Sequence, residues 1–159
     1  MSFVMTDEIT EGEIALRRVF DVPRERVWRA WTKPEELTRW WGKRGWTAPL
    51  ETIEMDVRPG GAFRLVNVRD DDGAEMPQEG VYREVVEHER LVFAEGAGEG
   101  CPESEQAVTI VTFADLDDGR TELFLHSSVH TTEANRDQMR GGMESALDRL
   151  AERLGEGGQ

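Results

Sequence analysis

Three histidines are the residues of this chain best suited to acid–base or metal chemistry. His126 and His130 are four positions apart in a stretch that reads as a strand, so both would point to one face, with Ser128 between them. His88 falls in a turn between two expected strands. No Cys or Glu stands near the pair at ligand spacing, and there is no His-Glu-x-x-His motif. We therefore expect a polar face near a strand end, with no metal site and no cofactor.

Two acidic segments and one cysteine also resemble reactive motifs. The segments 70–73 (DDDG) and 115–119 (DLDDG) lack the twelve-residue calcium pattern with its final Glu, so they read as hairpin turns. Cys101 lies in a Gly- and Glu-rich loop with no basic neighbour that would activate its thiol. Nucleophile elbows, P-loops and dinucleotide fingerprints are missing from the sequence. We therefore expect no catalytic residues of these known types.

The charge balance of the 159-residue chain excludes several classes of partner. Its formal net charge is −14, which repels nucleic-acid backbones and anionic lipid surfaces. No apolar run approaches the roughly 20 residues of a membrane span, and the N-terminus does not resemble a signal peptide. The single cysteine permits no internal disulfide. These features predict a cytoplasmic protein that neither binds nucleic acid nor inserts into membranes.

Hydrophobic periodicity predicts the elements that would position these residues. A strand over 13–20 is followed by two short helices, one in DVPRERVWRAW and one in PEELTRWW. Six strands then come in succession, over 50–57, 62–69, 79–87, 90–95, 107–115 and 120–129. A long amphipathic helix covers 133–154, with apolar residues at spacings of three and four.

This order predicts one α+β domain over 13–154, with flexible tails at 1–12 and 155–159. Consecutive strands pair most simply as hairpins, so the sheet should be antiparallel, with six or seven strands. The sheet and the long helix each have one apolar face. We therefore expect the sheet to curve around the C-terminal helix, with the two short helices after the first strand closing one end.

All five tryptophans lie between Trp28 and Trp46, in the stretch WRAWTKPEELTRWWGKRGW. An acidic domain is a poor host for base stacking, so we expect these residues to close one end of the sheet. Trp28 and Trp40 should pack where the short helices meet the sheet and the long helix. Trp41 or Trp46 should line the mouth of a cavity or lie exposed.

Four motifs in order carry a family resemblance: VPRERVWRAWTKPEELTRWWG, MDVRPGGAFR, EGVYREVVEHERLVF and GGMESALDRLAERL. Together they resemble the START-like helix-grip (SRPBCC) superfamily, in the branch homologous to the C-terminal domain of the activator of heat-shock protein 90 ATPase. The resemblance covers residues 13–154. It implies a helix-grip fold with a hydrophobic cavity between the long helix and the sheet. In this branch the last helix usually begins with Gly-Trp, whereas here the residues are Gly141, Gly142 and Met143.

Strand alternation and the resemblance together suggest which side chains face this cavity. Asn67, Tyr82 and Glu84 are the polar groups that would orient a ligand. Arg18 would need an anionic ligand or an acidic partner, and the alternative is an ion pair at the rim. The expected lining comprises Arg18, Trp28, Trp31, Trp41, Phe63, Leu65, Asn67, Tyr82, Glu84, Phe93, Val111, Phe113, Leu123, Leu125, Met139 and Met143, most of which would also form the core.

Three functions are compatible with this sequence. The first is binding of a small apolar or amphipathic molecule in the cavity, which we favour. The second is a cyclase- or hydrolase-like enzyme that uses the same cavity, with Glu84, His126 and Arg18 as its first candidates. The third is a chaperone-associated stress-response module, which exposed apolar residues around Trp41–Trp46 would favour. The chain could be a monomer or a weak homodimer paired through sheet edges.

Overall fold

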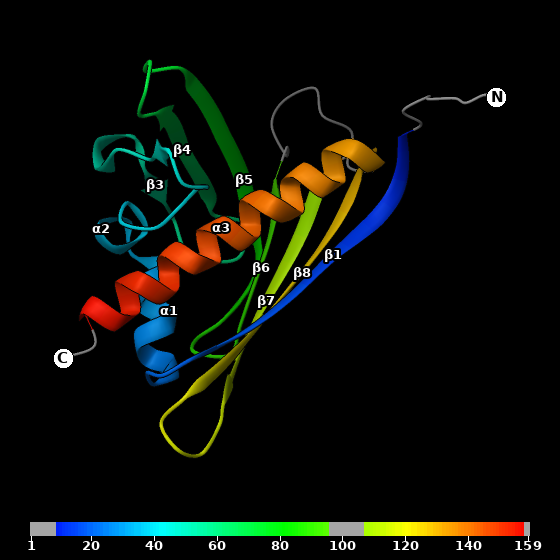
Figure 1. Ribbon diagram of the computed structural model, residues 1–159. Coiled ribbons are helices and arrows are strands. Elements are labelled where there is room, and N and C mark those ends of the chain that lie inside the picture. The colour runs from blue at the N-terminus through cyan, green and yellow to red at the C-terminus, as the bar shows by residue number, and fades with distance from the viewer. Residues whose placement is uncertain (1–8, 96–106, 158–159) are drawn as a thin grey trace.

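An antiparallel sheet of eight strands carries the fold, and one long helix lies across one of its faces (Figure 1). The computed structural model describes residues 9–95 and 107–157, except the side chains of residues 9–11, 130 and 156–157. The strands are β1 (Ile9–Phe20), β2 (Trp46–Thr47), β3 (Glu54–Met55), β4 (Ala62–Arg69), β5 (Glu75–Val86), β6 (Arg90–Glu95), β7 (Ala107–Asp115) and β8 (Thr121–Thr132). The helices are α1 (Arg24–Thr32), α2 (Pro34–Leu37), a 3₁₀ turn (Leu50–Thr52) and α3 (Glu133–Gly157).

The strand order is β1-β8-β7-β6-β5-β4-β2, with β3 also paired to β4. The first strand therefore lies beside the last one, and the remaining neighbours follow the chain as hairpins. The expected α+β helix-grip fold is confirmed. The sheet has one strand more than the seven expected because β2, of two residues, is added beside β4. β3, also of two residues, lies within the expected strand 50–57 and pairs with β4 as well. Within the described residues, no helix is both long and apolar enough to cross a membrane.

Both ends of the folded region extend beyond the expected limits. β1 begins at Ile9, inside the segment 1–12 expected to be a tail, because its pairing with β8 continues without interruption from Phe20 to Ile9. α3 continues to Gly157, past the expected end at 154. At the N-terminal end, β8 extends to Thr132 and pairs with β1 as far as Ile9. The residues around Ile9 do not by themselves indicate a strand.

The segment 50–57 is not the continuous strand that its alternation suggests. Leu50–Thr52 forms a 3₁₀ turn instead, and β3 contains only Glu54 and Met55. The Thr52 hydroxyl donates to the carbonyl of Pro49 at 2.7 Å and accepts from the backbone N–H of Val66 at 3.2 Å. A threonine side chain that bonds locally in this way offers the backbone an alternative to a strand ladder.

The strand β5 begins at Glu75, earlier than the expected start at 79, and includes Pro77. Proline has no N–H to donate to a sheet, so it is tolerated only where no neighbour needs that donor. Pro77 is paired with Val66 of β4, whereas β6 joins β5 only from Gly80 onward in the described residues. The extra residues of β5 therefore extend the sheet beyond β6, in the direction of β2.

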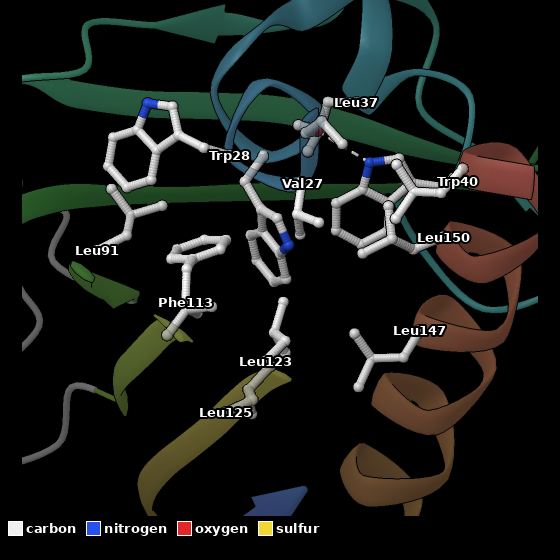
Figure 2. Packing of buried hydrophobic residues seen from close by; sticks show 14 of the residues in the cluster. Val27, Trp28, Leu37, Trp40, Leu91, Phe113, Leu123, Leu125, Leu147 and Leu150 are labelled. Carbon is white, nitrogen blue, oxygen red and sulfur yellow. Dashed lines mark hydrogen bonds between the residues drawn. The ribbon is translucent and has the colours of Figure 1, made fainter. Parts of the chain in front are cut away.

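The core lies where α3 and the two short helices meet the sheet (Figure 2). Leu147 and Leu150 of α3 face the side chains of the sheet and of α1, and both are almost fully buried. Trp40 is 1% exposed, and its indole N–H donates to the carbonyl of Ala30 at 2.9 Å. A buried tryptophan needs such a partner for its polar edge, so this bond fixes the turn after α2 against α1.

An ion triad joins the three helices. The carboxylate of Glu36 on α2 accepts from Arg26 of α1 at 3.2 Å and from Arg153 of α3 at 3.3 Å. The side chain of Glu36 is only 15% exposed. Burial alone would raise the pKa of Glu36, but the hydrogen bond from Arg153 and the two positive charges outweigh it and lower this pKa.

A second tie connects α3 to residues 41–46, which we call the tryptophan loop. One terminal nitrogen of Arg149 donates to four backbone carbonyls of this loop at 2.9–3.4 Å, those of Trp41, Gly42, Lys43 and Trp46. Arg44 of the same loop pairs with Glu152, almost one turn further along α3. Gly42 has φ of +89°, a conformation that glycine adopts without strain. The loop is therefore held against the helix through its backbone.

We predict that Arg149→Met will lower the free energy of unfolding by about 2 kcal/mol, since hydrogen bonds from charged donors contribute roughly this much. Methionine retains an apolar stem but leaves the loop carbonyls without their donor. Urea denaturation measures the change. Arg140→Met on the same helix is the control, because Arg140 makes no hydrogen bond or ion pair within the described part of the chain. Equal losses in the two variants would show that the loop tie does not stabilise the fold.

We also predict that the ion triad makes stability sensitive to acid. The folded-state pKa of Glu36 lies below its ordinary value of 4.5. Its contribution is therefore complete above that value and is lost as pH falls through the lower folded-state pKa. Glu36→Gln should be less stable by about 3 kcal/mol at neutral pH and should lose this part of the acid dependence. Denaturation at a series of pH values tests this, with the exposed neighbour substitution Glu35→Gln as control. An unchanged acid profile in Glu36→Gln would refute the assignment.

Candidate functional site

A cavity of about 350 Å³ lies between α3 and the sheet. Its walls come from the tryptophan loop, from strands β4 to β8, and from α3. The lining comprises Trp31, Trp40, Trp41, Gly42, Lys43, Trp46, Asn67, Met76, Gln78, Phe93, Glu95, Thr109, Leu125, Asn135, Gln138, Met139, Gly142, Met143, Ala146 and Leu147. Most of these groups are apolar, and the polar ones are few, as in sites that bind small molecules.

The helix side of the cavity is built from small and flexible side chains. Going along α3, the lining residues Met139, Gly142, Met143 and Ala146 precede Leu147, where the close-packed core begins. A Cβ atom added to Gly142 would have no other atom within 4 Å. Gly142 and Ala146 leave space above the sheet, and the flexible side chains of Met139 and Met143 border this space.

The sheet side carries a chain of hydrogen bonds that ends at a carboxyl group. The indole N–H of Trp41 donates to the side-chain oxygen of Gln78 at 3.1 Å, and the side-chain amide of Asn67 donates to the same oxygen at 3.0 Å. The amide nitrogen of Gln78 in turn donates to the carboxylate of Glu95. Four residues from the tryptophan loop, β4, β5 and β6 are thus joined on one wall of the cavity.

The direction of these bonds follows from the indole, which can only donate. Because Trp41 donates to Gln78, the oxygen of Gln78 must face Trp41 and its nitrogen must face Glu95. The same oxygen then requires the nitrogen of Asn67, so the oxygen of Asn67 is left on the other side. Asn67 is 3% exposed, and this oxygen has no hydrogen-bond partner within the described residues. The network therefore leaves one buried acceptor, the oxygen of Asn67, unsatisfied.

Glu95 and Lys43 are the charged side chains of the lining. Burial raises the pKa of Glu95, and the hydrogen bond from Gln78 offsets part of that rise. No arginine or lysine pairs with Glu95 within the part of the chain that the structure describes. Lys43 is exposed on the tryptophan loop, at the rim. The interior of the cavity therefore carries a carboxyl group without a protein counter-ion.

Two further polar features lie near the cavity. The hydroxyl groups of Thr109 and Ser127 are buried and bonded to each other at 3.0 Å, which satisfies them across β7 and β8. The indole nitrogen of Trp31 is buried without a hydrogen-bond partner in the described residues. Its ring stands at steep angles to those of Trp40 and Trp41, with centroids 4.8 and 6.1 Å away. Trp31 is thus packed mainly by aromatic neighbours.

The structure brings seven of the expected cavity residues to the lining: Trp31, Trp41, Asn67, Phe93, Leu125, Met139 and Met143. Phe63 and Tyr82 lie next to them around a much smaller void of about 10 Å³. Burial raises the pKa of Tyr82, so its hydroxyl stays protonated. Another five are packed in the core and do not contact the cavity: Trp28, Leu65, Val111, Phe113 and Leu123.

The remaining two expected residues lie elsewhere. Arg18 pairs with Asp148 of α3 at 2.6 Å, which corresponds to the rim ion pair considered as the alternative. Glu84 is exposed and pairs with Arg90 at 2.6 Å, so the expectation that it faces the cavity is wrong. A register shift between Tyr82 and Glu84 in β5 is the reason, because one extra residue moves the side chains after it to the opposite face.

The five tryptophans take different positions around this end of the fold. Trp28 and Trp40 are buried, as expected, and Trp28 packs edge-on to Phe113 with ring centroids 5.3 Å apart. Trp41 and Trp46 are half-buried and line the cavity. The guanidinium of Arg69 lies 5.4 Å from the ring centroid of Trp46 and covers it. None of the five therefore forms an exposed apolar surface.

The histidines lie outside the cavity lining. His126 points away from the cavity side of β8 and contacts Glu13 at 2.5 Å. His88 occupies a left-handed turn, with φ of +67°, and packs near Trp28. The side chain of His130 and all of Cys101 lie outside the described residues. Over residues 9–95 and 107–157, no group of three or more His, Cys, Asp or Glu side chains is placed to hold a metal ion.

The most informative polar residues of the cavity, Gln78 and Glu95, were missed by sequence reasoning. Gln78 precedes residue 79, the expected start of its strand, and was given no place in the sheet. Glu95 carried a usable signal, because Leu91, Phe93 and Glu95 alternate on one strand and must share a face. A glutamate that follows two apolar residues on the same strand face indicates a carboxyl group on the cavity side of the sheet.

The chain is similar to several solved structures over almost its whole length. A protein from Chromobacterium violaceum is 28% identical with a TM-score of 0.73, and the match covers 87% of this chain and 94% of that one. A protein from Nitrosomonas europaea is 25% identical with a TM-score of 0.75, covering 91% and 94%. An AHSA1-like protein from Aeromonas hydrophila, 22% identical with a TM-score of 0.77 over 92% and 94%, shares the fold.

No curated protein matches the sequence significantly. A family model, by contrast, matches residues 21–155, which include both short helices, the tryptophan loop, β2 to β8 and nearly all of α3. The matched region contains every residue of the cavity lining. The chain therefore belongs to the family of activator of Hsp90 ATPase homolog 1-like proteins.

Proposed function

We propose that this protein binds a small amphipathic molecule in the cavity between the sheet and α3, in the cytoplasm. The observation that carries the proposal is the cavity itself, whose volume of about 350 Å³ is within the range of small-molecule sites. The cavity is open to solvent on the side of the exposed residues Lys43 and Met76, so a small molecule can enter it.

The distribution of groups around the cavity supports an amphipathic ligand over a purely apolar one. The half-buried rings of Trp41 and Trp46 offer apolar surface to a ligand, and the almost fully buried Trp31 and Trp40 lie behind them at the base of the cavity. Gln78 and Glu95 place hydrogen-bonding groups together on one wall. A ligand with an apolar body and one polar end would match both parts without leaving buried polar groups unpaired.

The family name also suggests contact with a chaperone, but the tryptophan loop does not favour that function. An interaction module would expose apolar side chains there. Instead Trp40 is buried, Trp41 packs against the core, and Trp46 lies under Arg69. The loop backbone is tied to α3 by Arg149. These residues serve as a cavity wall.

Filling the cavity from α3 tests the proposal. The probe is N-phenylnaphthylamine, a neutral apolar dye whose binding is followed by energy transfer from the tryptophans. We expect wild-type protein to bind it and Gly142→Phe to bind at least about tenfold more weakly, because the new ring occupies the space above Gly142. The variant should be no less stable than wild type, since glycine is a poor residue for a helix interior.

Gly141→Phe is the matched control. Gly141 is the neighbouring glycine of the same helix, is exposed, and also has open space around an added Cβ atom. It does not line the cavity. The control should bind the dye as wild type does. Loss of binding in both variants, or in neither, would contradict binding in this cavity.

A further inference from the structure

We propose that the cavity selects amines: Glu95 receives the ammonium group of the ligand, while its apolar body lies against the tryptophans. This inference rests on the proposed function and names the chemical class of the ligand. It concerns the polar wall formed by Trp41, Asn67, Gln78 and Glu95.

The hydrogen-bond chain on this wall leaves one carboxylate oxygen as the acceptor for a ligand. Both donors that face Gln78, from Trp41 and Asn67, are already used within the chain. The amide nitrogen of Gln78 is directed to one oxygen of Glu95. What is left for a ligand is the second carboxylate oxygen of Glu95, which makes no hydrogen bond within the described residues, because the unpartnered oxygen of Asn67 is itself buried and faces Gly42. A ligand that donates hydrogen bonds therefore fits this wall better than one that only accepts them.

The charges around the cavity point the same way. Glu95 is half-buried, and a carboxylate that is partly removed from water without a cation favours a ligand that brings a positive charge. Glu95 has no arginine or lysine partner among the described residues, and burial raises its pKa. Lys43 is the other charged group of the lining and is exposed at the rim, where water screens it.

The aromatic lining and the net charge add to this preference. Two half-buried indole rings, those of Trp41 and Trp46, line the same cavity as Glu95. Aromatic faces attract cations, and tryptophan does so most strongly. The formal charge of −14 also raises the local concentration of cations near the protein. An ammonium group thus meets favourable interactions during its approach and when bound.

Three probes that share one ring system test the selection: naphthylethylamine, naphthylethanol and naphthylacetate, which end in a cation, a neutral hydroxyl and an anion. Tryptophan fluorescence titration at neutral pH gives the three affinities. We expect the amine to bind about tenfold more tightly than the alcohol, as a charge-assisted hydrogen bond would allow, and the acetate to bind most weakly. Tighter binding of the acetate would mean that Lys43 selects an anion and would overturn the proposal.

Glu95→Gln isolates the carboxylate. Glutamine has the same shape and still accepts from Gln78, so the wall should keep its arrangement. We expect this variant to lose the preference for the amine and to bind the alcohol as wild type does. Glu84→Gln is the control, since Glu84 is an exposed carboxylate on the outer face of the same sheet, and it should keep the preference. An unchanged amine-to-alcohol ratio in Glu95→Gln would overturn the proposal.

The pH dependence provides an independent readout. Because the ammonium group needs the charged form of Glu95, the affinity for the amine should fall as pH is lowered through the raised pKa of this carboxyl group. The affinity for the alcohol should change little. If the alcohol binds in wild type but not in Gly142→Phe, and no amine preference is found, only the amine inference fails. If none of the three probes binds, the proposed function fails as well.

Discussion

One constraint shapes this molecule: a single helix must cover the inner face of a sheet that is wider than the helix. The leucines of α3 occupy its C-terminal half, where Leu147, Leu150 and Leu154 pack against the short helices and the sheet. The preceding turns carry Met139, Gly142, Met143 and Ala146, which line a cavity instead of filling it. The leucines of α3 therefore form a close-packed end, and the small residues Gly142 and Ala146 leave an open end that the two methionines border.

Hydrogen bonds and ion pairs fix the position of α3 relative to the rest of the fold. α3 has to be held at the correct height above the open end, where it has few apolar contacts. Arg149 binds the backbone of the tryptophan loop, and Glu36 is bound by Arg26 and Arg153. The Arg149 tie lies beside the cavity, and the Glu36 triad lies at the close-packed end. The loop that Arg149 holds also provides Trp41, which begins the hydrogen-bond chain toward Glu95. Stability and the arrangement of the polar wall thus depend on the same contacts.

The sequence was sufficient for the fold, but it placed only seven of the twenty residues that line the cavity. Regular alternation predicted β4, β6 and β7 at their observed limits, and the spacing of apolar residues predicted α3. Alternation failed where a local feature changed the face of a strand. The register shift in β5 moved Glu84 outward, and the Thr52 side chain replaced a strand with a turn. Gln78 was missed because Pro77 concealed the first part of its strand.

The central claim is that the open end of the fold holds a small molecule. Native mass spectrometry of the protein after incubation with a cellular small-molecule extract tests it most directly. The account predicts a bound adduct of defined mass on wild-type protein and on Gly141→Phe, and its loss from Gly142→Phe, in which the cavity is filled. The absence of any adduct on wild-type protein, or an adduct that persists in Gly142→Phe, would contradict it.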